Sequence, residues 1–194
     1  MMWPIILCSI IAIGIIVERL WTLKEDKVLP AGLTAKILAL IEAQQVNDKV
    51  VQALQQNSPL GRVFAAGIAQ TGRPHAMVVE RMQDTGRHAV LELDRFLNTL
   101  GTIAGVAPLL GLLGTVSGII RSFNAITAVG LGDPRALSAG IAEALVCTAT
   151  GLAVAIPSLI AFRYLRGRVD RLAVAIEKDA MLIADALDAP RSDS

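Results

Sequence analysis

The chain has 194 residues and a mean hydropathy of +0.57; 54% of its residues are hydrophobic and 18% are charged. The formal net charge of +1 gives no reason to expect a nucleic acid as partner. Cys8 and Cys147 lie in different apolar segments, which argues against a disulfide framework, and the spacings of a metal site are missing. Because three long segments carry almost no charge, the composition indicates an integral membrane protein.

The first apolar segment starts at the amino terminus and contains no charge before Glu18. A secretory signal is the alternative interpretation, but the segment has no basic region ahead of it and no Ala-x-Ala-like cleavage site before Glu18 and Arg19. We therefore expect an uncleaved first transmembrane helix over residues 1–21. Trp21 at its end is typical of the membrane interface.

Residues 22–97 form a more polar region in which apolar residues still recur at helical intervals. The pattern predicts a helix over 33–56 and a break at Asn57-Ser58-Pro59. A short helix is expected over 60–70. The region is thus predicted to be a set of helices rather than disordered chain.

A second break at 71–74 precedes His75, and no strong helix breaker follows it before Pro108. The apolar residues in between keep helical spacing. We therefore expect one long helix that begins near His75 and continues into a second transmembrane helix over residues 98–124.

A third transmembrane helix is predicted over residues 138–164, since about 20 mainly apolar residues suffice to cross the hydrocarbon core. The loop 125–137 between the second and third spans has turn chemistry. After the third span, an apolar stripe continues at helical spacing through residues 165–187, and we expect it to pack against helices of the middle region. Residues after Asp188 are predicted to be a disordered tail.

The basic residues near the segment ends are distributed unevenly between the two sides of the membrane. Apart from the amino terminus, one side has only Arg121 and Arg135. The other side holds Arg19, Lys24, Lys27, Arg87, Arg95, Arg163, Arg166, Arg168 and Arg171. The positive-inside rule then places the amino terminus in the periplasm and residues 22–97 and 165–194 in the cytoplasm. The predicted fold class is an all-α polytopic membrane protein with three transmembrane helices, two of them extended into a cytoplasmic helical bundle.

Glu143 is the only ionisable residue between Arg135 and Arg163. A charged side chain near the bilayer centre is disfavoured by roughly 2.5–3.5 kcal/mol on insertion scales, so such residues usually line a polar path or pair with another group. No basic residue lies in the same span. The structural alternative is a permanently protonated carboxyl that is hydrogen-bonded across a helix interface. Since desolvation favours the neutral acid and a cation or water favours the anion, Glu143 is our leading candidate for a proton relay.

Glycines recur in the second span, and spacings of four residues allow helices to approach closely in lipid. Close packing is the first interpretation of Gly111, Gly114 and Gly118; the alternative is that Thr115, on the same face, lines a polar conduit. Thr148 lies about 140° from Glu143 on an ideal helix, which favours contact with another helix. Both in-helix prolines, Pro108 and Pro157, are interpreted first as kinks and second as mobile joints.

Three stretches carry a resemblance to a known family: Ala107-Pro108-Leu109-Leu110-Gly111-Leu112-Leu113-Gly114-Thr115-Val116, Gly140-Ile141-Ala142-Glu143-Ala144-Leu145-Val146 and Gly151-Leu152-Ala153-Val154-Ala155-Ile156-Pro157. With the Glu-Arg-Leu-Trp ending of the first span, they closely resemble the MotA/TolQ/ExbB proton-channel family. The resemblance covers the two long spans and agrees with a three-span topology.

The resemblance implies a homopentamer in the bacterial inner membrane, whose central pore holds transmembrane helices of an ExbD- or TolR-like partner. Proton flow down the gradient would drive the assembly, and force would reach the outer membrane through TonB or TolA. The family's pore threonine matches Thr115, its glutamate Glu143 and its second threonine Thr148. An intramembrane aspartate, which this chain lacks, would come from the partner. No cofactor, metal or enzymatic activity is implied.

Within the family, residues 108–116 look more like ExbB than TolQ, which tends to carry aromatic residues there. The longer amino-terminal extension frequent in ExbB-like proteins is missing, so a TolQ-like subunit of the Tol-Pal system is the alternative. A non-conducting membrane scaffold would explain the glycine-rich spans but not the acidic Glu143 within the membrane. An intramembrane enzyme would need a second carboxylate, a Ser/His pair or a metal cluster. A passive ion channel differs from a motor in not depending on an ExbD-like partner.

Overall fold

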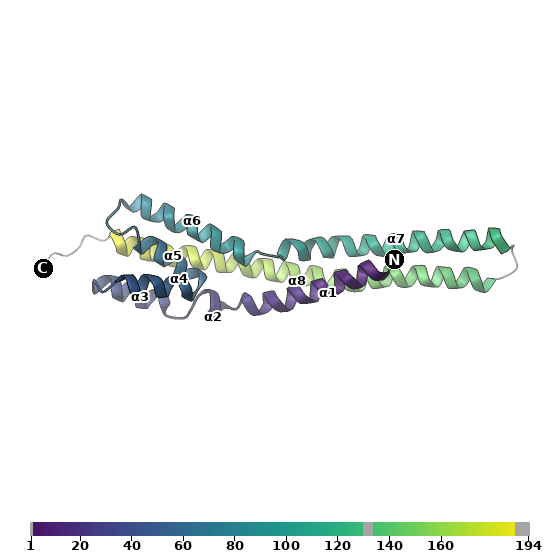
Figure 1. Ribbon diagram of the computed structural model, residues 1–194, viewed down its shortest axis with the longest axis horizontal. Helices are drawn as coiled ribbons and strands as arrows, with labels where there is room; N and C mark the ends of the chain where they lie inside the picture. Colours follow the sequence, from purple (N-terminus) through teal and green to yellow (C-terminus); the bar gives the residue numbers. More distant parts are fainter. Residues whose placement is uncertain (1, 130–133, 189–194) are drawn as a thin grey trace. The chain divides into compact units, whose positions relative to one another are not determined.

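The structure, a computed structural model, describes residues 2–129 and 134–188, with side chains described for 2–124 and 138–188. All regular secondary structure in these ranges is helical, which confirms the predicted all-α class. The helices are α1 (Met2–Thr22), α2 (Glu25–Val28), α3 (Leu33–Glu42), α4 (Asp48–Asn57), α5 (Pro59–Ile68), α6 (His75–Leu93), α7 (Leu97–Val129) and α8 (Pro134–Asp188) (Figure 1).

Three helical segments of the described chain are long and apolar enough to cross a membrane: Met2–Thr22, His75–Asn124 and Ser138–Asp188. Their most apolar stretches have mean hydropathies of 2.0, 2.0 and 2.1. The three predicted spans are thus matched by three candidate membrane helices. The non-helical segment between the second and third spans is shorter than the predicted loop 125–137, because α7 continues to Val129 and α8 begins at Pro134. The turn between them and the predicted tail after Asp188 lie outside the described residues.

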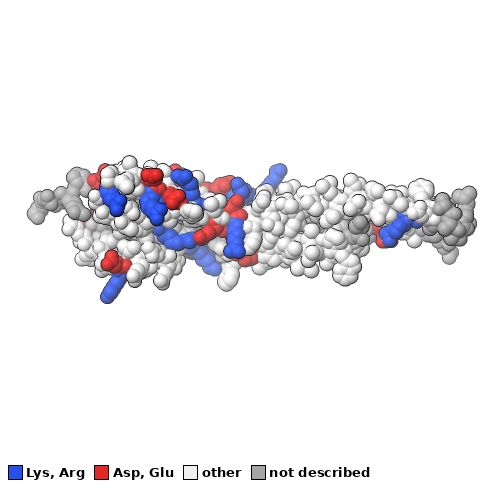
Figure 2. Space-filling view, turned by 45° about the horizontal axis from the view of Figure 1, so that its top comes forward, with Lys and Arg blue, Asp and Glu red and all other residues white. Residues whose placement is uncertain are grey.

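The chain divides into two compact units. The first unit consists of Met1–Arg19 and Phe96–Leu165, and the second of Leu20–Arg95 and Arg166–Ser194. Figure 2 shows that charged side chains gather over one part of the surface and leave another part almost uncharged. Within the first unit, the charged residues with described side chains are Glu18, Arg19, Arg121, Glu143 and Arg163. Such a surface suits a hydrocarbon environment.

The helix predicted over 33–56 is divided in two, because α3 ends at Glu42 and α4 begins at Asp48. Gln44 has a φ of +54°, a left-handed conformation that ends the first helix. The Asn47 side chain then accepts a hydrogen bond from the Val50 backbone amide at 3.1 Å and caps the second. Asparagine is a strong N-cap residue, so this boundary has a sequence signal that periodicity alone overlooks.

The prediction of one continuous helix from His75 into the second span is wrong at residues 94–96, where α6 ends and α7 has not yet begun. Phe96 has a φ of +64°, which is uncommon for a residue with a side chain. In the first unit, the Arg19 guanidinium lies 5.6 Å from the centroid of the Phe96 ring. In the second, Arg166 donates to both carboxylate oxygens of Asp94 at 3.0 and 2.9 Å. These tertiary contacts stabilise a turn that local propensity does not indicate.

Helix α8 runs unbroken from Pro134 to Asp188, and the prediction that its apolar stripe packs against the middle region is confirmed. The stripe residues Val169, Leu172, Ile176, Ala180 and Ile183 are buried. Asp179, beside this stripe, accepts a hydrogen bond from the Thr34 hydroxyl at 2.7 Å, and Arg168 donates to the Leu23 carbonyl at 2.7 Å. Both contacts join α8 to segments more than a hundred residues earlier in the chain.

A surface ion pair in the second unit gives a stability prediction that depends on pH. Arg62 on α5 donates two hydrogen bonds to the carboxylate of Glu92 on α6. These bonds lower the pKa of Glu92 and raise that of Arg62. Because the folded-state pKa of Glu92 is depressed, the pair stabilises the fold above the unfolded-state pKa of this carboxyl, and the effect is lost as pH falls through the folded-state pKa.

Arg62→Gln is therefore expected to lower the free energy of unfolding near neutral pH by roughly 0.2–1 kcal/mol, the range of exposed ion pairs. In acid below the folded-state pKa of Glu92, the variant and the wild type should unfold alike. Denaturant titrations of both proteins in the same detergent at the two pH values make the comparison. An equal difference at both pH values would show that Arg62 acts through packing instead of charge.

Candidate functional site

Helices α7 and α8 of the first unit pack against each other through small residues (Figure 1). A Cβ added at Gly111 would lie 3.0 Å from the Cys147 carbonyl oxygen, and one at Gly118 would lie 2.8 Å from the Ala144 Cβ. One at Gly151 would lie 2.7 Å from the Ala107 carbonyl oxygen. These contacts are tighter than ordinary van der Waals contact. The two helix backbones therefore approach as closely as glycine permits.

The register of the two antiparallel helices is uniform along the contact. Gly111 and Gly151 are equidistant in sequence from position 131, and the same holds for Gly118 with Ala144. Gly140 meets the Ser122 side chain in the same register. The Ser122 hydroxyl is buried but donates to the Gly118 carbonyl at 3.0 Å, so no buried donor is left unsatisfied there. Close packing thus extends over several turns of both helices.

Glu143 lies on α8 at the edge of this contact, and its carboxylate is paired. Arg121 Nη2, on α7, donates to Glu143 Oε1 at 2.8 Å. The two side chains are 61% and 55% exposed in the single chain, so both remain accessible to a partner or to water. No basic residue lies in the same span as Glu143, and the sequence pattern alone did not indicate Arg121 on the neighbouring helix as its counter-charge. A signal existed, because the two residues are nearly equidistant from the turn between the spans.

The two threonines predicted for the proton path are held by other groups. The half-buried Thr115 hydroxyl donates to the Leu112 carbonyl of its own helix at 2.6 Å. Thr148 Oγ1 donates to the Gly111 carbonyl of α7 at 3.1 Å. Of these described side chains, no two among Thr115, Thr148 and Glu143 are hydrogen-bonded to each other. A proton path through all three therefore needs water or another chain.

The remaining predicted residues have simple positions. Gly114 is buried on α7. The two prolines lie inside helices that run unbroken past them, Pro108 half-buried in α7 and Pro157 exposed in α8. Neither proline ends its helix.

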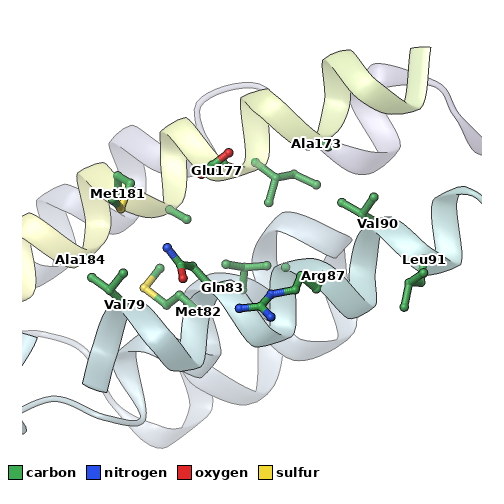
Figure 3. A pocket seen from close by; sticks show the side chains of 14 residues that line it. Val79, Met82, Gln83, Arg87, Val90, Leu91, Ala173, Glu177, Met181 and Ala184 are labelled. Atoms are coloured by element: carbon green, nitrogen blue, oxygen red, sulfur yellow. The ribbon is translucent and has the colours of Figure 1, made fainter. Parts of the chain in front are cut away.

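A cavity of about 600 Å³ lies in the second unit between α6 and α8 (Figure 3). Its lining is mainly apolar and includes Met82 and Val90 on α6 and Met181 and Ala184 on α8. The polar residues of the lining include Gln83, Arg87 and Glu177. Over the part of the chain that the structure describes, no group of three His, Cys, Asp or Glu residues is placed to hold a metal ion. Glu143 in the first unit therefore remains the leading candidate for a functional residue.

Glu143 is the candidate proton-binding group of the first unit. It is the only acidic residue with a described side chain in the first unit's parts of α7 and α8, it lies at the edge of their contact, and its partner is the Arg121 guanidinium. In general, a nearby cation favours the ionised form of a carboxyl and desolvation favours the neutral form. Carboxyl groups within membrane helices commonly mark ion or proton pathways.

Comparison with known proteins identifies the family of the chain. The sequence profile of the MotA/TolQ/ExbB proton channel family matches residues 55–178, which include α5, α6, α7 and most of α8. The chain belongs to this family. Glu143 lies within the part of the chain that matches this family.

Several relatives in the family are named after transport or envelope systems. The chain is 33% identical to the biopolymer transport protein ExbB-like 1 of Synechocystis sp., over 84% of this chain and 66% of that protein. It is 30% identical to the biopolymer transport protein exbB1 of Vibrio cholerae, over 91% of this chain and 79% of the relative. With the Tol-Pal system protein TolQ of Haemophilus influenzae it shares 31% identity, over 84% of this chain and 67% of the relative. ExbB and TolQ relatives are thus similar to the chain to the same degree.

Proposed function

We propose that this MotA/TolQ/ExbB family member is an ExbB-like subunit of a proton-driven motor in the bacterial inner membrane. With an ExbD-like partner, it would use the proton motive force to energise TonB-dependent uptake across the outer membrane. The observation that carries the proposal is the carboxylate of Glu143, exposed beside Arg121 at the edge of the closely packed pair α7 and α8. Thr115 and Thr148 would complete the proton path with water or partner groups.

The proposed assembly is a homopentamer with ExbD-like helices, and their aspartate, inside the pore. Large apolar side chains on α7 and α8 support an assembly in lipid, since Leu109, Leu112 and Leu145 are each more than half exposed in the single chain. In this arrangement residues 1–21, 98–124 and 138–164 would span the membrane. Residues 22–97 and 165–194 would lie in the cytoplasm, and the amino terminus would be periplasmic.

A TolQ-like role in the Tol-Pal envelope system, with TolR- and TolA-like partners, is the second candidate. It is favoured by the 31% identity to a Tol-Pal system protein TolQ, which is close to the 30% identity to exbB1 of Vibrio cholerae. The motif Pro108-Leu109-Leu110-Gly111-Leu112-Leu113-Gly114-Thr115-Val116, without an aromatic residue, favours the ExbB-like role.

Complementation separates the two roles. The full chain is expressed with its cognate ExbD-like partner in cells that lack ExbB and TolQ, and ferric-siderophore uptake is measured beside outer-membrane integrity. The proposal expects restored uptake that depends on TonB and on the partner. Restored integrity without uptake would assign the chain to the Tol system. Uptake that persists without the ExbD-like partner would contradict a motor and favour a passive channel.

A further inference from the structure

The Arg121–Glu143 pair differs from the other arginine–carboxylate pairs that join helices in the described chain. Arg62 reaches both oxygens of Glu92 through two nitrogens, and Arg166 reaches both oxygens of Asp94 through Nη1 alone. Arg121 makes one hydrogen bond, from Nη2 to Oε1 at 2.8 Å. Two-point pairs are stronger and geometrically more specific than one-point pairs. The pair at Glu143 is thus suited to exchange of its cation.

The position of this pair is fixed by the helix backbones on both sides of it. Arg121 lies between Gly118 and Ser122, and Glu143 lies between Gly140 and Ala144. Gly118 contacts Ala144, and Gly140 contacts Ser122, so the helices touch closely on either side of the ion pair. Separation of the helices is therefore not needed to break the pair. Rotation of the long Arg121 side chain suffices, and its exposure leaves room for that rotation.

We propose that Arg121 is the internal counter-ion of Glu143, a positioning residue that keeps the carboxylate ionised until a proton replaces it. When Glu143 is protonated, the hydrogen bond from Arg121 breaks and the proton binds to a carboxylate oxygen. The Arg121 guanidinium then turns toward water or toward an anionic group of a partner. Both states leave the carboxyl without an unpaired charge. The inference rests on the proposed function, to which it adds the group that competes with the proton.

Few other titratable groups face this carboxylate. On α8 itself, Cys147 is one turn away and buried. Helix α1 carries Cys8 as its only titratable side chain before Glu18. Asp133 and Arg135 belong to the stretch whose side chains are not described. On α7, Arg121 is the only charged residue from Leu97 to Val129. Among the described side chains of the two helices, Arg121 is the cation that contacts Glu143.

Infrared spectroscopy of the full chain with its partner in lipid vesicles tests the pairing directly. The carbonyl band of a protonated carboxylic acid is recorded near neutral pH and assigned to Glu143 by its absence in Glu143→Gln. Arg121→Gln should raise the ratio of protonated to ionised Glu143 by about tenfold or more, because an unpaired carboxylate in apolar surroundings favours the neutral acid. Arg121→Lys, which keeps the charge, should restore the ionised form. Arg163→Gln removes an arginine elsewhere on α8 and should leave the band unchanged.

The same variants distinguish this inference from the proposed function. If Arg121→Gln leaves the band as in the wild type, Arg121 is not the counter-ion and the inference is overturned, whatever the uptake assay shows. If Arg121→Lys resembles Arg121→Gln, shape rather than charge holds the carboxylate, which also overturns it. A band that responds as expected in a protein that fails to support uptake would uphold the pairing and reject the proposed function alone.

Discussion

Replacement of Glu143 by glutamine is expected to reduce proton-driven uptake by about 100-fold or more, the lower end of what a positioned proton-transfer group contributes. Glutamine has the same shape, and its side-chain carbonyl can still accept the hydrogen bond that Arg121 donates at 2.8 Å. The packing of α7 against α8 should therefore survive. What the variant loses is the ability to bind and release a proton.

The measurement is ferric-siderophore uptake in cells lacking ExbB, with wild type or Glu143→Gln at matched membrane levels and with the cognate partner. Proton flux into vesicles is recorded in parallel. Glu177→Gln is the matched control, because it removes an exposed carboxylate from the same helix in the other unit. Wild-type uptake and flux in the Glu143→Gln protein would assign Glu143 a structural role and end the proton-relay mechanism.

Features that depend on local sequence were predictable. Glu143 stands out as a candidate from the sequence alone, because a lone carboxylate in an uncharged run can be recognised without the fold. The unbroken helix α8 was predicted because its apolar stripe keeps one period from the third span to residue 187. In both cases the relevant physics, burial of charge or of an apolar face, acts on residues adjacent in sequence.

Features that depend on residues distant in sequence were not predicted. The break between α6 and α7 is stabilised by Arg19 over Phe96 and by Arg166 on Asp94, and these contacts exist only in the folded chain. Arg121 was overlooked for the same reason, since its role appears only when the register of α7 on α8 is known. Of the two residues of the candidate ion pair, Glu143 can therefore be found from the local sequence, whereas Arg121 requires the tertiary structure.

A second large effect is expected from a single methyl group at the α7–α8 contact. Gly151→Ala places a Cβ 2.7 Å from the Ala107 carbonyl oxygen and 3.1 Å from the Gly111 Cα. All nearby atoms belong to the backbone, so no side chain can move aside and the two helices must separate. Overpacking of this kind costs about 1–3 kcal/mol. The free energy of unfolding, measured by titration with a denaturing detergent, should fall by that amount.

Gly105→Ala is the matched control, because an added Cβ there meets no atom within 4 Å. Its effect should stay within about 0.5 kcal/mol, as for substitutions away from packed contacts. Equal stability of the two variants would mean that α7 and α8 can adjust without loss. Gly151 is eight residues from Glu143, or about 12 Å along a helix, so its methyl group cannot touch the carboxylate. Loss of uptake in Gly151→Ala at normal membrane levels would therefore show that backbone packing between the helices is what positions Glu143 for proton transfer.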